Sequence, residues 1–496
     1  MKYFALILLI LSFNSFGSIC DDHQDFEKIA VLNKGRVKPY FVAAKEFTKA
    51  ITSKSKISNI DTNKLFCLVS MNDYESIKAQ INIKVEHFEL KKFLGLADSD
   101  LFINIEQALE KKELVRSEIM GQKENNSYKK ALNKFWFKAN TFEKATKGEL
   151  WTVYQKSDKQ SEQKYTWQPI SNFKEISTPQ LLEENSYFKK NNENTIDIET
   201  TYAKSNIFTY AMLIALIAII LTVMRKSASI GFAAGWILII TEAIGMTFRV
   251  LISGRAPITN MYETVLFSGF GALFIALIIY IFKRDKLFIL GGLGYNILCL
   301  FMMRFADGML SESISPLVPV LRDNFWLSTH VTTIILSYAA LALSWMLANM
   351  TLIKGRFGTL SSKDLRYYED LIYTAIKVGI VLLAAGIILG GVWADYSWGR
   401  FWGWDPKETW SLIVLLFYMA ILHGKSTPWV NTRRFINLSA AGFMTVMMAW
   451  FGVNYILATG LHSYGFSEGG AIFLGVFFIS QIVLIILANI KVKTRA

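Results

Sequence analysis

Residues 207–224 read IFTYAMLIALIAIILTVM, an apolar run that contains no charged side chain. A helix needs roughly 20 mostly apolar residues to cross a bilayer. The run also marks a change in composition, because Lys, Glu, Asn, Gln and Ser are frequent before residue 205, and Leu, Ile, Phe, Ala, Gly and Met dominate after it. One such run could be a buried helix of a soluble protein, but a long series of them excludes that interpretation.

Similar runs continue to the end of the chain and predict about nine membrane spans, with boundaries uncertain by several residues. The expected spans are 207–224, 230–248, 262–282, 287–304, 329–353, 370–393, 409–424, 438–457 and 470–490. The predicted fold is therefore an all-α polytopic membrane protein over residues 207–496. A mostly α or α+β soluble domain is expected to precede it.

The chain is strongly basic, with a formal net charge of +13. In a soluble protein this charge could indicate nucleic-acid binding, but here the positions of the charges favour another explanation. Every second connection between spans is basic, which is the positive-inside pattern of membrane proteins; examples are Arg225, Lys283, Lys354, Lys425 and Lys491. The pattern predicts that these connections are cytoplasmic and that the loops 393–410 and 458–469 lie outside. No nucleic-acid partner is expected.

The N-terminus resembles a secretory signal. Met1-Lys2 precedes the apolar stretch Tyr3–Phe13 and then small residues, so residues 1–19 are predicted to be a signal sequence, with an uncleaved anchor as the alternative. Residues 20–206 would then form an extracytoplasmic soluble domain. Nothing in it indicates catalysis, and a binding or docking role is expected.

Local patterns predict four features of this soluble domain. They are a basic stretch Lys34–Pro39, a helix over 41–51, a long polar helical stretch over 106–145, and a polar linker over 183–200.

The chain has three cysteines. Cys299 falls in a predicted span and is expected to pack as a small apolar residue. Cys20 and Cys67 both lie in the exported region, and the sequence leaves open whether they pair. A Cys-x-x-Cys-His motif does not occur, so the chain is not itself a c-type cytochrome.

The loop 393–410 contains five tryptophans in eighteen residues: Trp393, Trp398, Trp402, Trp404 and Trp410. An aromatic belt at the membrane interface is the simpler explanation. The density of rings and the interleaved glycines instead favour a flat apolar surface, on which a large planar ligand could stack. Asp405 is expected to cap the helix that follows, with Pro406 in its first turn and Glu408 near its positive end.

Histidines suggest what that ligand contains. His23 and His87 lie in the soluble region and are expected at its surface. His330 and His462 lie at the predicted outer face, and imidazole is a common axial ligand of haem iron, although membrane histidines more often serve packing. His423 lies thirteen residues beyond Trp410, roughly 20 Å deeper along a helix. An ionisable group at that depth is usually functional, so a second haem position is predicted there.

Two cations lie on the outer face, where the positive-inside rule does not place them. Arg249 and Arg255 flank or belong to the loop Gly254–Glu263. They could pair with Glu263 or Asp405, or they could hold the propionates of haem. The sequence leaves both possibilities open.

The segment Trp398-Gly-x-x-Trp402-x-Trp404-Asp-Pro-Lys-Glu-Thr-Trp410 resembles the tryptophan-rich WWD signature of haem-handling proteins in cytochrome c biogenesis. Within that group the chain is most similar to the CcsA, or ResC, component of the system II cytochrome c synthase. Gly254–Glu263, His330 and Gly460–Phe466 belong to the same resemblance, which covers most of residues 205–496. Gly35–Pro39 is more weakly similar to the exported region of fused CcsBA synthases.

The resemblance implies a cytochrome c haem lyase subunit in a bacterial inner membrane, with its soluble domain and WWD segment on the periplasmic side. Haem b would reach the outer face from the cytoplasm, with His330 and His462 as its axial ligands. The tryptophan segment would present the vinyl edge to the thiols of a Cys-x-x-Cys-His apocytochrome c, which would add to form thioethers. No side chain needs to be a nucleophile, because holding the reactants together supplies the main advantage.

The resemblance also places His423 at a deeper transit site with a second histidine, which this chain lacks. In the family that residue belongs to the CcsB, or ResB, part, so a separate partner of this type is expected. The alternative function is a haem exporter or carrier that passes haem to a separate chaperone or lyase.

Overall fold

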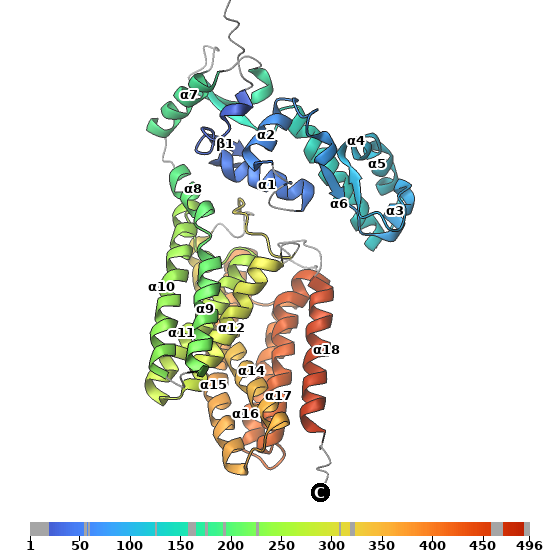
Figure 1. Cartoon of the computed structure of the whole chain (residues 1–496). Coiled ribbons are helices and arrows are strands. Elements are labelled where there is room, and N and C mark those ends of the chain that lie inside the picture. Colours follow the sequence, from blue (N-terminus) through green and yellow to red (C-terminus); the bar gives the residue numbers. More distant parts are fainter. Residues whose placement is uncertain are drawn as a thin grey trace, which may run out of the picture. The chain divides into compact units, whose positions relative to one another are not determined.

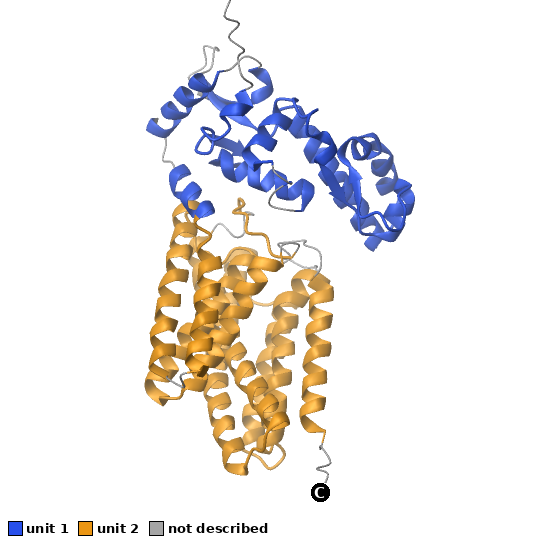
Figure 2. Ribbon diagram, viewed as in Figure 1, with its two compact units in different colours: residues 1–204 blue, residues 205–496 orange. Residues whose placement is uncertain are grey.

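The computed structural model describes residues 19–53, 57, 60–124, 126–156, 165–173, 177–191, 195–224, 228–306, 309–317, 323–457 and 470–490 (Figure 1). The chain divides into two compact units, residues 1–204 and residues 205–496 (Figure 2). Of the predicted signal sequence, only Ile19 lies within the described residues.

Unit 1 is mostly helical with three small sheets. Its helices are α1 (Tyr40–Thr52), α2 (Thr62–Ser70), α3 (Phe88–Leu94), α4 (Ile105–Glu110), α5 (Lys112–Gly121), α6 (Ser127–Thr146), α7 (Thr178–Asn191) and α8 (Ile196–Ser205). Its strands pair in sequence order as antiparallel two-stranded sheets: β1 (Ala30–Asn33) with β2 (Arg36–Pro39), β3 (Asn82–Lys84) with β4 (Phe102–Asn104), and β5 (Thr152–Lys156) with β6 (Tyr165–Pro169).

Helix α1 confirms the helix expected over 41–51, and the stretch 106–145 is helical as expected, though not one continuous helix. The stretch 106–145 is three helices, because the chain breaks between α4 and α5 and again before Asn126, whose side chain caps α6. The linker predicted over 183–200 is wrong for most of its length, because residues 183–191 belong to α7 and residues 196–200 to α8. Ile196, Glu199 and Thr200 of α8 are buried, so its polar composition conceals an amphipathic face.

The basic stretch Lys34–Pro39 forms a hairpin rather than an open patch. Lys34 and Gly35 both have positive φ, 51° and 75°, as tight hairpin turns require. Arg36 donates to both carboxylate oxygens of Glu199 at 2.7 Å. Lys38 is buried and donates to Glu46 at 2.8 Å; burial lowers the pKa of Lys38, and Glu46 opposes that shift. These cations therefore stabilise the fold of unit 1.

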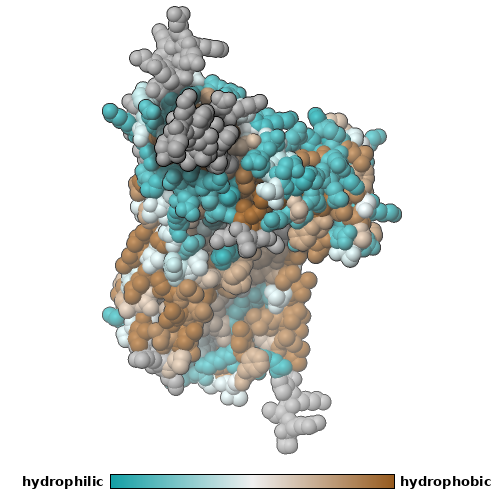
Figure 3. Space-filling model, turned by 45° about the horizontal axis from the view of Figure 1, so that its top comes forward, coloured by the Kyte–Doolittle hydropathy of each residue, from teal (hydrophilic) through white to brown (hydrophobic). Residues whose placement is uncertain are grey.

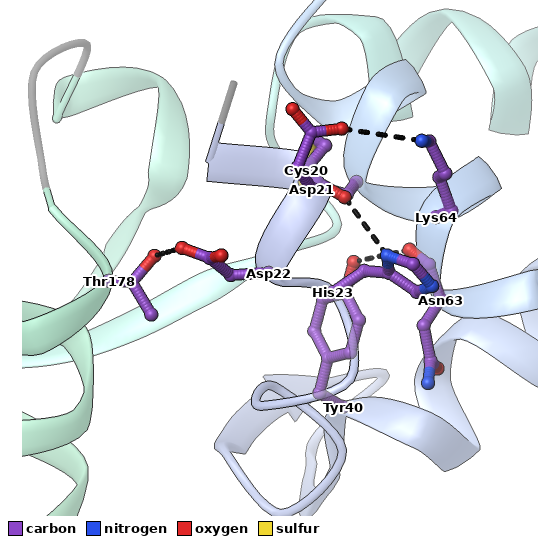
Figure 4. Close-up of a disulfide and its surroundings, with 9 residues drawn as sticks. Cys20, Asp21, Asp22, His23, Tyr40, Asn63, Lys64 and Thr178 are labelled. Carbon is purple, nitrogen blue, oxygen red and sulfur yellow. Dashed lines mark hydrogen bonds and ion pairs between the residues drawn. A yellow bond between two sulfur atoms is a disulfide. The ribbon is translucent and has the colours of Figure 1, made fainter. Parts of the chain in front are cut away.

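Cys20 and Cys67, whose pairing the sequence left open, form a disulfide (Figure 4). Both sulfurs lie in the buried core of unit 1. Next to the bridge, Lys64 pairs with Asp21 at 3.3 Å, and Tyr40 donates to the backbone carbonyl of Asn63 at 3.0 Å. The bridge ties the N-terminal segment of unit 1 to α2.

Unit 2 is a helical bundle. Its elements are α9 (Ile207–Met224), α10 (Ala228–Ser253), α11 (Met261–Lys283), α12 (Lys286–Phe305), α13 (Asn324–Trp326), the π-helix η5 (Leu327–Val331), α14 (Thr332–Phe357), α15 (Ser362–Trp398), α16 (Pro406–Lys425), α17 (Thr432–Met447), the π-helix η6 (Met448–Leu457) and α18 (Gly470–Asn489). Each of the nine expected spans coincides with one of these helices or continuous helical segments.

Eight helical segments in the described residues are long and apolar enough to cross a membrane, which confirms the polytopic all-α prediction. The expected ninth, 409–424, forms the helix α16 but is not among the eight. Lys407 and Glu408 stand at one end of α16, and His423 and Lys425 at the other. The apolar stretch between Ser411 and His423 is therefore short.

The surface of unit 2 fits lipid surroundings. Figure 3 shows hydrophobic side chains covering much of its visible surface, and α18 buries only Gly470, Leu474 and Gln481. Polar side chains inside the bundle pair across helices, as when Gln481 accepts from Trp345 at 2.7 Å and from Asn349 at 3.1 Å. Such interhelical bonds are typical of membrane helices, because water is not available to satisfy the polar groups.

Candidate functional site

A cavity of about 390 Å³ lies inside unit 2. Its walls come from the start of α11, from η5 and α14, from the last turns of α15, from the start of α16, and from η6. Most of the lining is apolar or aromatic, with a few polar side chains among them. This size and this mixture are typical of sites for organic ligands.

His330 contributes to this cavity from the π-helix η5. Its Nδ1 lies 2.9 Å from the backbone carbonyl oxygen of Gly386 on α15. A carbonyl can only accept, so Nδ1 carries the proton and the lone pair of the neutral ring is on Nε2. A hydrogen bond from the other ring nitrogen fixes the tautomer and the orientation of a metal-binding imidazole.

The tryptophans of 393–410 do not form the single flat surface predicted from the sequence. Helix α15 continues to Trp398, and only residues 399–405 form a loop. Trp402 and Trp404 meet at 90° with ring centroids 6.0 Å apart, and Trp404 is 70% exposed. Trp393 is buried, and its ring contacts the His330 ring edge-to-face at 5.7 Å.

Two of the five tryptophans line the cavity, namely Trp393 and Trp402. Trp398 lies under Arg400, whose guanidinium is 5.7 Å from its ring centroid. Trp410, in α16, is partly buried against the core of the bundle. The structure thus gives the rings different surroundings, and Trp398, Trp404 and Trp410 are not among the residues that line the cavity.

The charged residues at the start of α16 form the cap expected from the sequence. Asp405 and Glu408 make a capping box, and Pro406 lies in the first turn. Glu408 also accepts from the backbone nitrogen of Gly403 at 2.7 Å and pairs with Arg400 at 3.3 Å. Asp405 is buried and is not among the residues that line the cavity. This end of α16 therefore holds the tryptophan loop in place.

Arg249 and Arg255 have structural contacts. Arg249 is fully buried and pairs with Glu263 at 2.6 Å, and Glu263 also accepts from Thr259. Arg255 donates to the backbone carbonyl of Ser315 at 2.6 Å. The pairing with Glu263 is therefore confirmed for Arg249. Neither arginine is among the described residues that line the cavity.

Among the described residues, the cation that lines the cavity is Lys407, which was not singled out from the sequence. One signal could have found it, because helical side chains lean toward the N-terminus of their helix. A lysine in the first turn of α16 therefore reaches back toward the tryptophan loop. Other missed lining residues, such as Tyr338, Trp450 and Tyr455, belong to helices distant in sequence.

His423 lies on α16 near its other end, away from the cavity. It is exposed, and its Nδ1 lies 2.8 Å from the carbonyl oxygen of Met419 on the same helix. It shares an exposed face of α16 with Ile413, Leu416 and Ala420. His462 lies outside the described residues.

The cavity wall suits a planar apolar ligand that carries a metal and polar substituents. Trp393 is nine-tenths buried, and its indole Nε1 has no hydrogen-bond partner among the described residues. A buried donor without an acceptor calls for an explanation, and a polar group of a bound ligand would supply one. His330 adds a metal-binding nitrogen, and Lys407 adds a positive charge.

Unit 2 is similar in sequence to proteins of cytochrome c biogenesis. Residues 258–462 match a family model described as "Cytochrome C assembly protein". The chain is 35% identical over 291 residues to the cytochrome c biogenesis protein CcsA of Guillardia theta, which covers 53% of this chain and 95% of that relative. The CcsA of Prochlorococcus marinus is 35% identical over 254 residues, covering 45% of this chain and 81% of the relative.

A larger relative is the protein NrfI of Wolinella succinogenes. It is 37% identical over 237 residues, which is 46% of this chain but only 25% of that relative. The family model covers residues of unit 2 alone, so it carries no information about the role of unit 1.

Proposed function

Because the chain belongs to the CcsA family of cytochrome c biogenesis proteins, we propose that it transports haem b to the outer face of the membrane and attaches it to apocytochrome c. Attachment would occur through thioether bonds at Cys-x-x-Cys-His motifs, together with a CcsB/ResB-like partner. The observation that carries the proposal is the cavity in which His330, held by Gly386, lies against Trp393.

Bound haem supplies the iron and the vinyl groups to which the apocytochrome thiols add. The chain itself supplies binding and orientation. His330 presents the Nε2 lone pair, and Trp393 and Trp402 provide apolar ring surface. Lys407, rather than Arg255, is the cation placed to hold a propionate, since Lys407 lines the cavity. The substrate brings its own nucleophiles, so proximity is the main contribution of the site.

His462 would hold the iron of the outer haem together with His330. Support comes from η6, because Asn454 and Tyr455 near its end line the cavity. Its last residue, Leu457, is followed five positions later by His462. A histidine so close in sequence to the cavity wall can serve as the partner of His330.

His423 supports the need for a partner chain. An imidazole that faces lipid from the surface of a membrane helix is costly. His423 is exposed on α16 beside apolar side chains. Met419 accepts from its Nδ1, so the lone pair lies on Nε2. We propose that a CcsB/ResB-like subunit covers this face and supplies the second histidine of an inner haem site.

The location proposed is a bacterial inner membrane, with unit 1 and the tryptophan segment on the periplasmic side. The alternation of basic connections supports this orientation. The disulfide between Cys20 and Cys67 supports export of unit 1, because disulfides persist mainly in oxidising compartments.

Reconstitution tests the proposal against its alternative, a haem exporter or carrier. The full chain is expressed with and without a CcsB/ResB-like partner, in cells that lack their own attachment system, together with an apocytochrome c. Covalent haem, seen by haem staining of denatured cytochrome, is expected only when the partner is present. An apocytochrome with both motif cysteines replaced by alanine is the matched control and should stay unstained.

Haem bound to the purified chain without covalent attachment under any partner condition would favour the carrier. Purified protein that holds no haem with or without the partner would contradict both functions.

A further inference from the structure

We infer that Gly390 is a positioning residue for His330, because the missing Cβ at Gly390 leaves the space in which the imidazole lies against α15. The inference rests on the proposed function only in taking His330 as a haem ligand. It concerns how the chain orients that ligand.

The geometry at Gly390 leaves no room for a side chain. A Cβ built there would lie 2.5 Å from Cε1 of His330, 3.0 Å from its Nδ1 and 3.3 Å from its Nε2. The first distance is shorter than any van der Waals contact permits. The close neighbour is a rigid ring, so relief requires movement of the imidazole or of α15.

The ring cannot move without losing its hydrogen bond. Its Nδ1 donates to the carbonyl oxygen of Gly386 at 2.9 Å, one helical turn before Gly390. A carbonyl oxygen has two lone pairs, so it can accept from the imidazole as well as within its own helix. Gly386 therefore fixes the tautomer, and Gly390 lets the ring approach closely enough for the bond to form.

The backbone that carries His330 is also unusual. His330 lies in the π-helix η5, between α13 and α14. Single π-turns within helices are rare and frequently occur at functional sites. On this turn the ring also contacts Trp393, with ring centroids 5.7 Å apart. The position of the His330 ring is thus determined by the π-turn that carries it, by the space at Gly390 and by contact with Trp393.

The same pair of helices provides a matched control. At Gly379, earlier in α15, a Cβ would lie 2.7 Å from Cδ2 and Cγ of Leu341 on α14. Alanine at position 379 therefore crowds the α14–α15 contact about as much as alanine at position 390 crowds the contact between η5 and α15. Only the alanine at position 390 meets His330.

The experiment compares Gly390→Ala, Gly379→Ala, His330→Ala and the double variant His330→Ala/Gly390→Ala, each as the full chain purified with its partner. Haem content and the visible absorption spectrum of the reduced protein report on axial ligation, and Tm reports on packing. Gly390→Ala is expected to weaken haem binding on the order of 10–100-fold and to shift the absorption bands, as happens when a metal-binding imidazole loses the hydrogen bond that orients it. Gly379→Ala is expected to keep the wild-type spectrum.

The double variant separates positioning from helix packing. Without the imidazole the alanine Cβ has room, so Gly390→Ala should lower Tm in the wild-type background and leave it unchanged in the His330→Ala background. An equal loss of Tm in both backgrounds, or an altered spectrum for Gly379→Ala, would overturn the inference. Wild-type protein without haem would instead contradict the proposed function, and the Tm comparison would still test the contact between Gly390 and His330.

Discussion

In the proposed orientation, His330 lies at the outer end of unit 2 and His423 at the inner end. Each lies against a backbone carbonyl, but in a different way. His330 donates across to Gly386 on another helix and lies in a cavity. His423 donates to Met419, four residues earlier on its own helix, and is exposed. On the proposed function, this chain builds the outer site largely from its own helices. On the same proposal, the inner end offers His423 as a ligand on a surface that another subunit would complete.

Replacement of His330 should have the largest effect. His330→Ala removes the ring from the cavity, and its bond to Gly386 with it, so covalent attachment of haem to apocytochrome c is expected to fall to background. The measurement is haem staining of the cytochrome, together with haem content of the purified chain. Insertion and Tm should change little, because the ring is replaced by a smaller side chain at a cavity wall.

A matched comparison for this variant is His87→Ala, a partly buried histidine of unit 1 whose Nε2 contacts the Ser127 hydroxyl at 3.2 Å. That variant should attach haem as the wild type does. Undiminished attachment by His330→Ala would remove the basis for assigning the outer site to this cavity.

The buried ion pair at the outer end should rank next, because it supports the cavity wall. Arg249→Ala leaves the carboxylate of Glu263 buried without its guanidinium, which should lower the free energy of unfolding by about 3–5 kcal/mol. In the pair Lys425–Glu369, Lys425 is partly exposed but Glu369 is buried. Lys425→Met should cost less than Arg249→Ala, because Thr432 still donates to the Glu369 carboxylate. Thermal unfolding in detergent measures both.

The double variant Arg249→Met/Glu263→Gln tests whether charge imbalance is the cause. It removes both charges and keeps an acceptor for Thr259, so it should regain most of the stability that Arg249→Ala loses. If the double variant is as unstable as Arg249→Ala, the pair acts through side-chain packing.

The sequence predicted the membrane unit well, because a spanning helix must be apolar along its whole length. The first expected span, 207–224, coincides with α9. Helices of unit 1 were harder to predict, because a helix at a protein surface exposes a polar face to water and only its other face is apolar. Helix α8 was predicted as a linker because its exposed face is polar, although Ile196 is buried.

The candidate site was predictable only in part. The sequence singled out His330, Trp393 and Trp402, which line the cavity, because histidine and clustered tryptophans are unusual at the ends of membrane helices. Their geometry was not predictable, because it depends on Gly386 and Gly390, which lie more than fifty residues from His330 in the sequence. The flat tryptophan surface failed as a prediction because α15 continues to Trp398 and separates the rings.

Replacement of His423 should affect haem attachment only when the partner subunit is present. With a CcsB/ResB-like subunit present, His423→Ala is expected to reduce attachment severalfold, because less haem reaches the outer cavity. Without the partner, the variant and the wild type should hold equal haem and unfold at equal Tm, since the side chain is exposed.

Ala420→Leu, on the same exposed face of α16, tests whether the partner covers that face. A larger side chain there should weaken partner binding, whereas it would cost nothing if the face met lipid. Equal partner binding by the Ala420→Leu variant and the wild type would contradict a covered face.

Two neighbouring tryptophans should give the smallest difference and the finest test of the outer cavity. Trp402 lines the cavity, whereas Trp404, two residues on, is 70% exposed and not among the lining residues. Trp402→Ala removes ring contact with bound haem and should cost about 1.5 kcal/mol, roughly tenfold in affinity. Trp404→Ala removes an exposed ring and should stay within about 0.5 kcal/mol. Haem titration of the purified protein measures both, with the partner kept constant. A larger loss from Trp404→Ala than from Trp402→Ala would mean that haem binds on the exposed side of the tryptophan loop, since both rings belong to that loop and differ chiefly in which side they face.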